Sequence, residues 1–177
     1  MKDIIIRNME KNEIDDIRKI DRSEIINHVY YFENDKLILK EEFYDIKGWN
    51  PNEIDSIINN LYSLYECNGY LYGAFKNSNL IGIIALESRF IGKNEDQLQL
   101  VFLHIDQKYR DKGLGHLLMD KAKLKAKELG AKKLYISATP SEHTIGFYLS
   151  LNCKLASDVN PELYQLEPED IHLELEI

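Results

Sequence analysis

The chain has 177 residues, of which 44% are hydrophobic, and its formal net charge is −8. This length suits one domain with a sizeable core, and the hydrophobic content excludes an intrinsically disordered chain. The negative charge argues against non-specific nucleic-acid binding. No apolar stretch approaches the roughly 20 residues of a membrane helix, so no membrane partner is expected. The start has no hydrophobic signal core and the two cysteines are too few for a disulfide scaffold, which predicts a cytoplasmic protein.

The first part of the chain predicts one strand and one helix clearly. Residues 3–8 are interpreted as a short strand. The pair Asn50-Pro51 is typical of a helix start, and isoleucines and leucines follow it at helical spacing. On this basis we interpret residues 22–67 as a largely helical segment. Within it, residues 29–44 are aromatic and charged without a clean period, and their structure stays open.

The middle of the chain predicts strands and then a long helix. Apolar runs bounded by Gly, Asn and Ser turns predict an antiparallel meander of three strands, at residues 69–75, 80–87 and 97–105. A helix is predicted over residues 114–129, because apolar side chains repeat on one face and Gly130 supplies a C-terminal stop. The residues of this face are Leu114, Leu117, Leu118, Ala122, Ala126 and Leu129.

The last part predicts a strand at residues 134–137, one more helix and two final strands. Thr139-Pro140-Ser141-Glu142 has the pattern of a capping box with proline at the first helical position, so a helix is predicted from there to about Leu151. Residues 153–156 and 171–177 are predicted as strands. This order of elements predicts a single α+β domain over residues 1–177.

The run Tyr109-Arg110-Asp111-Lys112-Gly113-Leu114-Gly115-His116 lies between a predicted strand and a predicted helix. Its two glycines let the backbone turn tightly and approach a ligand, because neither carries a Cβ. The helix that follows leaves its first N–H groups unpaired at the positive end of its dipole, an arrangement that binds anions and most often phosphate. Charge supports this interpretation, since residues 101–139 carry nine Lys and Arg against four Asp and Glu, a net charge of +5 in an acidic chain.

Other phosphate-binding and metal-binding patterns fit less well. A Rossmann dinucleotide site would need a third glycine where Leu118 stands, and a helix between the preceding strands. A Walker loop would need Gly-Lys-Ser or Gly-Lys-Thr after the glycines. The five histidines show no ligand spacing, so no metal site is expected.

The motif Arg110-x-x-Gly113-x-Gly115, after an alternating strand and before an amphipathic helix, resembles the acetyl-CoA signature of the GNAT superfamily of N-acetyltransferases. The resemblance extends through the strand at Leu134 and the helix that bears Phe147-Tyr148, as far as Asn152-Cys153. It implies a GNAT-like fold, in which a mixed and mostly antiparallel central sheet is flanked by helices. It also implies an acetyl-CoA-binding core at residues 97–152 and an acceptor-side segment at residues 22–67.

The resemblance further implies roles for individual residues. A backbone amide near Leu103 would polarise the thioester carbonyl, and Ile105 would pair with the pantetheine arm. Tyr148 matches the tyrosine that in many members lies close to the sulfur of CoA, where it can protonate the departing thiolate. Contacts to acetyl-CoA are expected from Leu103, Ile105, Arg110, Asp111, Lys112, Gly113, Leu114, Gly115, His116, Ser141 and Tyr148.

The residue that removes a proton from the acceptor amine is harder to identify. Several GNAT members use a glutamate on the strand before the turn, but the matching position here is Gln99, which cannot accept a proton. Water or another carboxylate would then serve, and Glu87 at the end of the preceding strand is the candidate. His104 is interpreted as structural, although an imidazole beside a cleft could act. Ser141 and Thr144 replace the asparagine and alanine that are usual at this helix start, which weakens any claim about fine positioning.

The implied activity is direct transfer of the acetyl group of acetyl-CoA to a primary amine. The acidic remainder of the chain favours a cationic small-molecule acceptor, such as a polyamine or an aminoglycoside-like amine. Two other functions stay open: a protein lysine or N-terminal acetyltransferase, and a catalytically silent acyl-CoA-binding module that senses or regulates. A homodimer is also left open.

Overall fold

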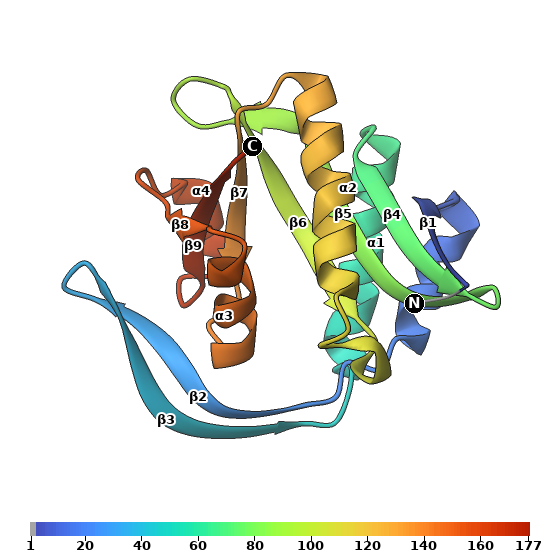
Figure 1. Ribbon diagram of the computed structural model, residues 1–177, viewed down its shortest axis with the longest axis horizontal. Coiled ribbons are helices and arrows are strands. Elements are labelled where there is room, and N and C mark those ends of the chain that lie inside the picture. Colours follow the sequence, from blue (N-terminus) through green and yellow to red (C-terminus); the bar gives the residue numbers. More distant parts are fainter. Residues whose placement is uncertain (1–2) are drawn as a thin grey trace.

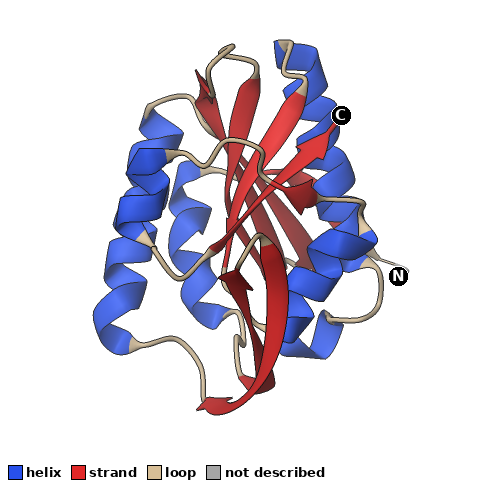
Figure 2. Cartoon of the chain, turned by 90° about the vertical axis from the view of Figure 1, so that its left-hand side faces the viewer, coloured by secondary structure: helices blue, strands red, loops and turns tan. Residues whose placement is uncertain are grey.

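The centre of the molecule is a seven-stranded sheet in the order β1-β4-β5-β6-β7-β9-β8. The structure is a computed structural model that describes residues 3–177. The strands of this sheet are β1 (Ile4–Asn8), β4 (Tyr70–Lys76), β5 (Asn79–Ile91), β6 (Gln97–Ile105), β7 (Lys133–Ala138), β8 (Lys154–Leu155) and β9 (Ile171–Glu176). Helices cover both faces of the sheet (Figures 1 and 2). They are η1 (Lys11–Lys19), α1 (Pro51–Glu66), η2 (Gln107–Tyr109), α2 (Leu114–Leu129), α3 (Glu142–Ser150) and α4 (Pro161–Leu166).

The predicted fold class is confirmed, because the sheet is mixed and mostly antiparallel. Among its pairings within residues 3–177, the parallel one joins β6 to β7. The other pairings, including the predicted β4–β5–β6 meander, are antiparallel.

Two hydrophobic clusters form the core, one on each face of the sheet. Consecutive residues of β5 show the alternation: Ile84 packs in the cluster with α2, whereas Ile83 packs in the cluster with α1 and η1. The predicted apolar face of α2 needs one correction. Leu117 is 40% exposed, because Gly115 and Met119 take the buried positions beside the stripe through Leu114 and Leu118.

The helix α3 starts two residues later than the predicted capping box. Ser141, not Thr139, is the N-cap, and its hydroxyl accepts a hydrogen bond from the Thr144 N–H at 3.2 Å. Ser141 is the better cap because its side chain lies within reach of that unpaired amide. The short helix α4 was not predicted. It is capped by Asn160 and begins at Pro161. Asn-Pro is a helix start signal in the sequence, but the helix that follows has only six residues.

The interpretation of residues 22–67 as largely helical is wrong for its first half. That half is an antiparallel hairpin of β2 (Glu24–Glu33) and β3 (Lys36–Ile46), and only α1 is helical. The hairpin turns at Asn34 and Asp35, which have φ angles of 50° and 61°. Asn and Asp tolerate this left-handed conformation, which suits the twist of a two-residue hairpin.

The hairpin extends from the body of the molecule and passes beside α3 (Figure 1). Two contacts attach it there. The Tyr30 N–H donates to the Pro140 carbonyl at 2.7 Å, and His28 Nδ1 lies 2.8 Å from a carboxylate oxygen of Glu142. These contacts hold the hairpin beside the start of α3.

The strands β6 and β7 pair over only part of their length and then separate (Figure 1). Pairing runs from Gln97 to Leu100 on β6, opposite Lys133 to Ile136 on β7. The next residue, Val101, is a bulge, since Leu100 and Phe102 pair with the adjacent residues Leu86 and Ala85 of β5. Past this bulge, β6 presents main-chain groups on its β7 side that no strand of the described sheet pairs.

Candidate functional site

A cavity of about 540 Å³ lies between the separated end of β6, the glycine turn and α3, and we call it the turn cavity. The residues that line it are Glu24, Leu103, His104, Ile105, Arg110, Asp111, Gly113, Gly115, His116, Glu142, His143, Thr144, Gly146, Phe147, Tyr148 and Ser150. The cavity thus joins an unpaired strand edge to a helix N-terminus. Both features offer main-chain N–H groups to a ligand.

The glycine turn has the conformation that the sequence predicts. Gly113 is the N-cap of α2 and has φ of 80°, in the left-handed region that favours glycine. Arg110 holds the start of the turn, because its Nε donates to the Ile105 carbonyl at 3.1 Å and its guanidinium lies 3.1 Å from Glu24. The turn is therefore fixed to both β6 and β2.

Gly115 is required for a different reason, which is packing. A Cβ at this position would lie 2.9 Å from the Phe147 ring and 3.3 Å from the Ile105 side chain. The missing side chain lets the first turn of α2 lie close to α3 and β6. The two glycines of the motif therefore have different roles. Gly113 allows the turn, and Gly115 allows the close contact of α2 with α3 and β6.

Tyr148 lies in the wall of the turn cavity and is only 6% exposed. Its ring packs against Phe147, with centroids 5.2 Å apart. Burial raises the pKa of the Tyr148 hydroxyl, and the charge of Asp170 raises it further. The hydroxyl therefore stays protonated at physiological pH, and Asp170 lies close enough to Tyr148 to interact electrostatically.

Most of the predicted ligand-contacting residues meet in the turn cavity. Those that line it are Leu103, Ile105, Arg110, Asp111, Gly113, Gly115, His116 and Tyr148. The side chain of Leu114 is in the core, that of Lys112 turns back to the Lys108 carbonyl, and that of Ser141 caps α3. For Lys112 and Leu114 the expected contact is through the backbone, so these side-chain positions leave it unchanged.

Glu87, the candidate base, lies elsewhere. It belongs to an irregular part of β5, where pairing with β6 is interrupted between Leu86 and Phe90, and its carboxylate accepts from the Ser88 N–H. Glu87 is not among the residues that line the turn cavity or the larger cavity beside it. Its role as the base stays a prediction, without support from the lining of either cavity.

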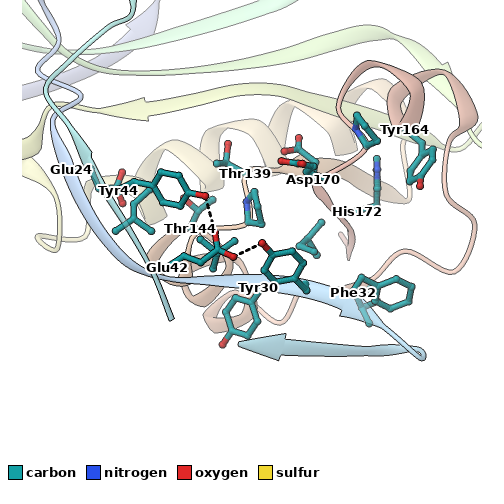
Figure 3. Close-up of a pocket in the computed structure, with 18 of the residues that line it drawn as sticks. Glu24, Tyr30, Phe32, Glu42, Tyr44, Thr139, Thr144, Tyr164, Asp170 and His172 are labelled. Carbon is teal, nitrogen blue, oxygen red and sulfur yellow. Dashed lines mark hydrogen bonds between the residues drawn. The ribbon is translucent and has the colours of Figure 1, made fainter. Parts of the chain in front are cut away.

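A second cavity, of about 930 Å³, lies between the β2–β3 hairpin, β9 and α4, and we call it the hairpin cavity. Figure 3 shows hairpin side chains on one side of it and Thr139, Asp170, His172 and Tyr164 on the other. The two cavities share four lining residues, which are Glu24, His104, Arg110 and Thr144. A ligand in one cavity would therefore meet a ligand in the other at this junction.

The hairpin cavity has more acidic than basic side chains. Four carboxylates line it, Glu24, Glu42, Glu169 and Asp170, against the two cations Arg22 and Arg110. Two tyrosine hydroxyls donate to Glu42. One is that of Tyr44, at 2.7 Å (Figure 3), and the other is that of Tyr31. Burial raises the pKa of Asp170, whose carboxylate accepts from the Ser137 hydroxyl at 2.9 Å. Sequence reasoning missed these residues, because they come from segments without a motif.

His104 stands at the junction of the two cavities. Its ring packs against Phe102 and Trp49, with centroids 4.6 and 4.9 Å away. Burial, together with the charges of Arg22 and Arg110, lowers the pKa of His104 to about 3. His104 is therefore neutral at physiological pH and is a poor base for an alkylammonium.

Residues 3–177 contain no group of three or more His, Cys, Asp and Glu side chains arranged to hold a metal ion. Across the same part of the chain, no helix has the length and apolar content to span a membrane.

A model of the acetyltransferase (GNAT) family matches residues 30–152 of the chain. Among solved structures, a Bacillus anthracis protein assigned as a streptothricin acetyltransferase, in complex with acetyl coenzyme A, superposes with a TM-score of 0.73 at 22% identity, over 98% of each chain. A nourseothricin acetyltransferase gives 0.68 at 18% identity, over 98% of this chain and 96% of that one. The PaiA N-acetyltransferase of Thermoplasma acidophilum, in complex with coenzyme A, gives 0.61 at 19%, over 98% and 99%. Comparison with curated proteins gives no match.

Proposed function

Given that this chain belongs to the acetyltransferase (GNAT) family, we propose that it transfers the acetyl group of acetyl-CoA to a primary amine of a small molecule held in the hairpin cavity. One observation carries the proposal. The turn cavity, with its helix N-terminus, and the acidic hairpin cavity share Glu24, His104, Arg110 and Thr144. Two substrates bound in these cavities would meet at that junction, and such proximity replaces a bimolecular encounter.

The turn cavity suits the chemistry of CoA. Main-chain N–H groups at the start of α2 bind the diphosphate, and the positive end of the helix dipole adds to the attraction. The unpaired edge of β6 beyond Val101 pairs with the amide-bearing pantetheine arm. The Leu103 N–H donates to the thioester oxygen, where negative charge develops as the amine attacks.

The reaction exchanges one acyl bond for another. The amine lone pair forms a C–N bond to the carbonyl carbon, the C–S bond breaks, and the sulfur leaves as a thiolate. The nitrogen loses one proton as the amide forms and the thiolate takes up one proton, so the step balances. Tyr148 donates a hydrogen bond to that sulfur from the wall of the turn cavity. Because burial raises the pKa of Tyr148, its proton is held tightly, and the hydroxyl stabilises the thiolate by this hydrogen bond as the proton moves.

The ammonium must first lose a proton, and Asp170 is the residue that accepts it. Glu24 is engaged by Arg110, and the low pKa of His104 excludes lasting protonation. Asp170 lines the hairpin cavity, and burial raises its pKa. A carboxylate with a raised pKa is a better proton acceptor than an ordinary one.

The proposal is tested by mixing the purified protein with acetyl-CoA and a panel of primary amines, and by following the release of free thiol. Amine-dependent thiol release, with an acetylated amine as the second product, is the expected result. Tight binding of CoA without thiol release across the panel would favour the silent acyl-CoA-binding module instead.

A further inference from the structure

His172 is a buried polar residue in the wall of the hairpin cavity that the proposed reaction does not use. It lies on β9, pairs with Ser137 of β7, and is only 7% exposed. Figure 3 shows it at the end of the cavity that Asp170 and Tyr164 also line. Its ring nitrogens have different surroundings, and this difference decides what the ring can bind.

Nδ1 of His172 accepts a hydrogen bond from Tyr135. The Tyr135 hydroxyl oxygen lies 2.8 Å from Nδ1 and accepts a hydrogen bond from the Asn160 N–H at 2.9 Å. The hydroxyl still has its own proton to donate, and within residues 3–177 the acceptor in reach is Nδ1, so we assign the hydroxyl as the donor of this hydrogen bond. Burial lowers the pKa of His172, so the neutral ring carries a single proton. That proton is on Nε2.

Nε2–H has no hydrogen-bond partner in the part of the chain that the structure describes. A buried donor without an acceptor is unfavourable, so native proteins rarely leave one without a water, an ion or a ligand as its partner. The side chain beside it is Tyr164 of α4, whose ring centroid lies 6.0 Å from that of His172. Tyr164 is 49% exposed and α4 has no buried residue. A ligand that approaches His172 from this side would therefore displace an exposed ring and not a part of the core.

We infer that the acceptor carries a hydroxyl or carbonyl oxygen that binds Nε2–H of His172 while its amine lies at Asp170. The inference rests on the proposed function. Asp170 and His172 both lie beside Ser137 and are two positions apart in the chain, which separates their Cα atoms by about 7 Å. An oxygen within a few bonds of an amine spans this distance. The acceptor class is therefore an oxygenated amine, such as an amino alcohol, an amino sugar or an amino-acid amide, and not an alkyl polyamine.

The test compares matched acceptors that differ only by the oxygen-bearing group. One pair is 1,3-diamino-2-propanol and 1,3-diaminopropane, and the other is L-lysinamide and cadaverine. The wild-type protein is expected to favour the oxygen-bearing member of at least one pair in kcat/KM by roughly tenfold or more, because the oxygen-free amine leaves a buried donor unpaired. Equal kcat/KM within both pairs would overturn the inference while leaving acetyl transfer intact.

Two variants assign that preference to the ring nitrogen. His172→Phe removes the donor but keeps a planar ring, and it is expected to reduce the preference to near unity, mainly through KM. His172→Gln restores an N–H donor and is expected to recover part of the preference. A preference that survives in His172→Phe contradicts the assignment.

Nitrogen NMR of histidine-labelled wild-type protein supplies a readout that does not depend on turnover. His172 is expected in the Nε2–H form, with its Nε2 signal shifted by the oxygen-bearing probe and not by its partner. An Nδ1–H form, or no shift with either oxygen-bearing probe, overturns the inference. A selective shift in a protein that acetylates no amine would instead support the site and refute the proposed function.

Discussion

In the proposed reaction the Tyr148 hydroxyl contacts the departing sulfur, and a substitution by phenylalanine removes this hydroxyl while it keeps the aromatic ring. The hydroxyl lies in the buried wall of the turn cavity, and its raised pKa keeps it protonated. In Tyr148→Phe the thiolate loses its hydrogen-bond donor, so kcat is expected to fall by about 100-fold. The Kd for CoA, measured by calorimetry, should stay within about twofold, because the diphosphate contacts lie at the glycine turn. An unchanged kcat would exclude Tyr148 as the group that stabilises the thiolate by a hydrogen bond.

Asp170 combines a role in rate with a cost in stability. Burial raises its pKa in the folded protein above the unfolded value. Its contribution to the free energy of unfolding is therefore present below the unfolded pKa and is lost as the pH rises through the folded pKa. At pH 7 the ionised carboxylate opposes folding.

Asp170→Asn is accordingly expected to be at least as stable as the wild type at pH 7 and much less active. We expect kcat/KM to fall by about 100-fold, while Tm does not fall. Scanning calorimetry and the thiol assay measure the two effects. A decrease in Tm that accompanies the loss of activity would indicate a structural role for Asp170 in place of proton transfer.

These residues show where sequence reasoning stops. The glycine turn was predictable, because all of its parts are adjacent in the chain and each has a local physical signature. Asp170 and His172 have no such signature. Their environment comes from Ser137 and Tyr135, more than 30 positions away, and only the pairing of β7 with β9 brings them together.

The element that most directly tests a sequence-based prediction is the N-terminus of α3. Ser141 was expected to contact acetyl-CoA, but its hydroxyl accepts from the Thr144 N–H and donates to the Thr144 hydroxyl. Loss of this cap in Ser141→Ala is expected to lower the free energy of unfolding by about 1 kcal/mol and Tm by about 2–4 °C. Ser141→Asn should keep the free energy of unfolding and the Tm of the wild type, because asparagine caps a helix equally well. A weaker Kd for CoA in Ser141→Ala with an unchanged Tm would instead support the contact to acetyl-CoA.

At this scale the predictions succeed where one face of an element is fully buried. α2 was predicted with its observed bounds, since Leu114, Leu118 and Ala122 are buried and repeat with the helical period. The hairpin was missed for the opposite reason. The side chains of β2 and β3 are nearly all half-buried or exposed, because the hairpin faces a cavity on one side and solvent on the other. Folding therefore does not require apolar and polar residues to alternate along such a segment, and this alternation is the pattern that predicts a strand.

Over the whole molecule, charge is divided between the segment that contains the glycine turn and the rest of the chain. Residues 101–139, which contain the glycine turn, carry nine basic against four acidic residues, while the chain as a whole has a net charge of −8. The hairpin cavity carries four carboxylates against two arginines. The carboxylates of the hairpin cavity would attract a cationic acceptor. The turn cavity is itself lined by Glu24, Asp111 and Glu142 against Arg110, so an anionic cosubstrate there would be held by the main-chain N–H groups at the start of α2 and not by an excess of basic side chains.

The acidic lining of the hairpin cavity predicts a dependence on ionic strength that scales with the charge of the acceptor. Salt screens the carboxylates of the hairpin cavity, so KM should rise between ~0.05 and ~0.5 M NaCl. The rise should be steeper for 1,3-diamino-2-propanol, which carries two charges, than for 1-amino-2-propanol, which carries one. Because both assays use the same acetyl-CoA concentration, screening at the glycine turn affects the two series equally. Equal slopes would mean that the acidic side chains of the hairpin cavity do not attract the acceptor, and that its charge is met elsewhere.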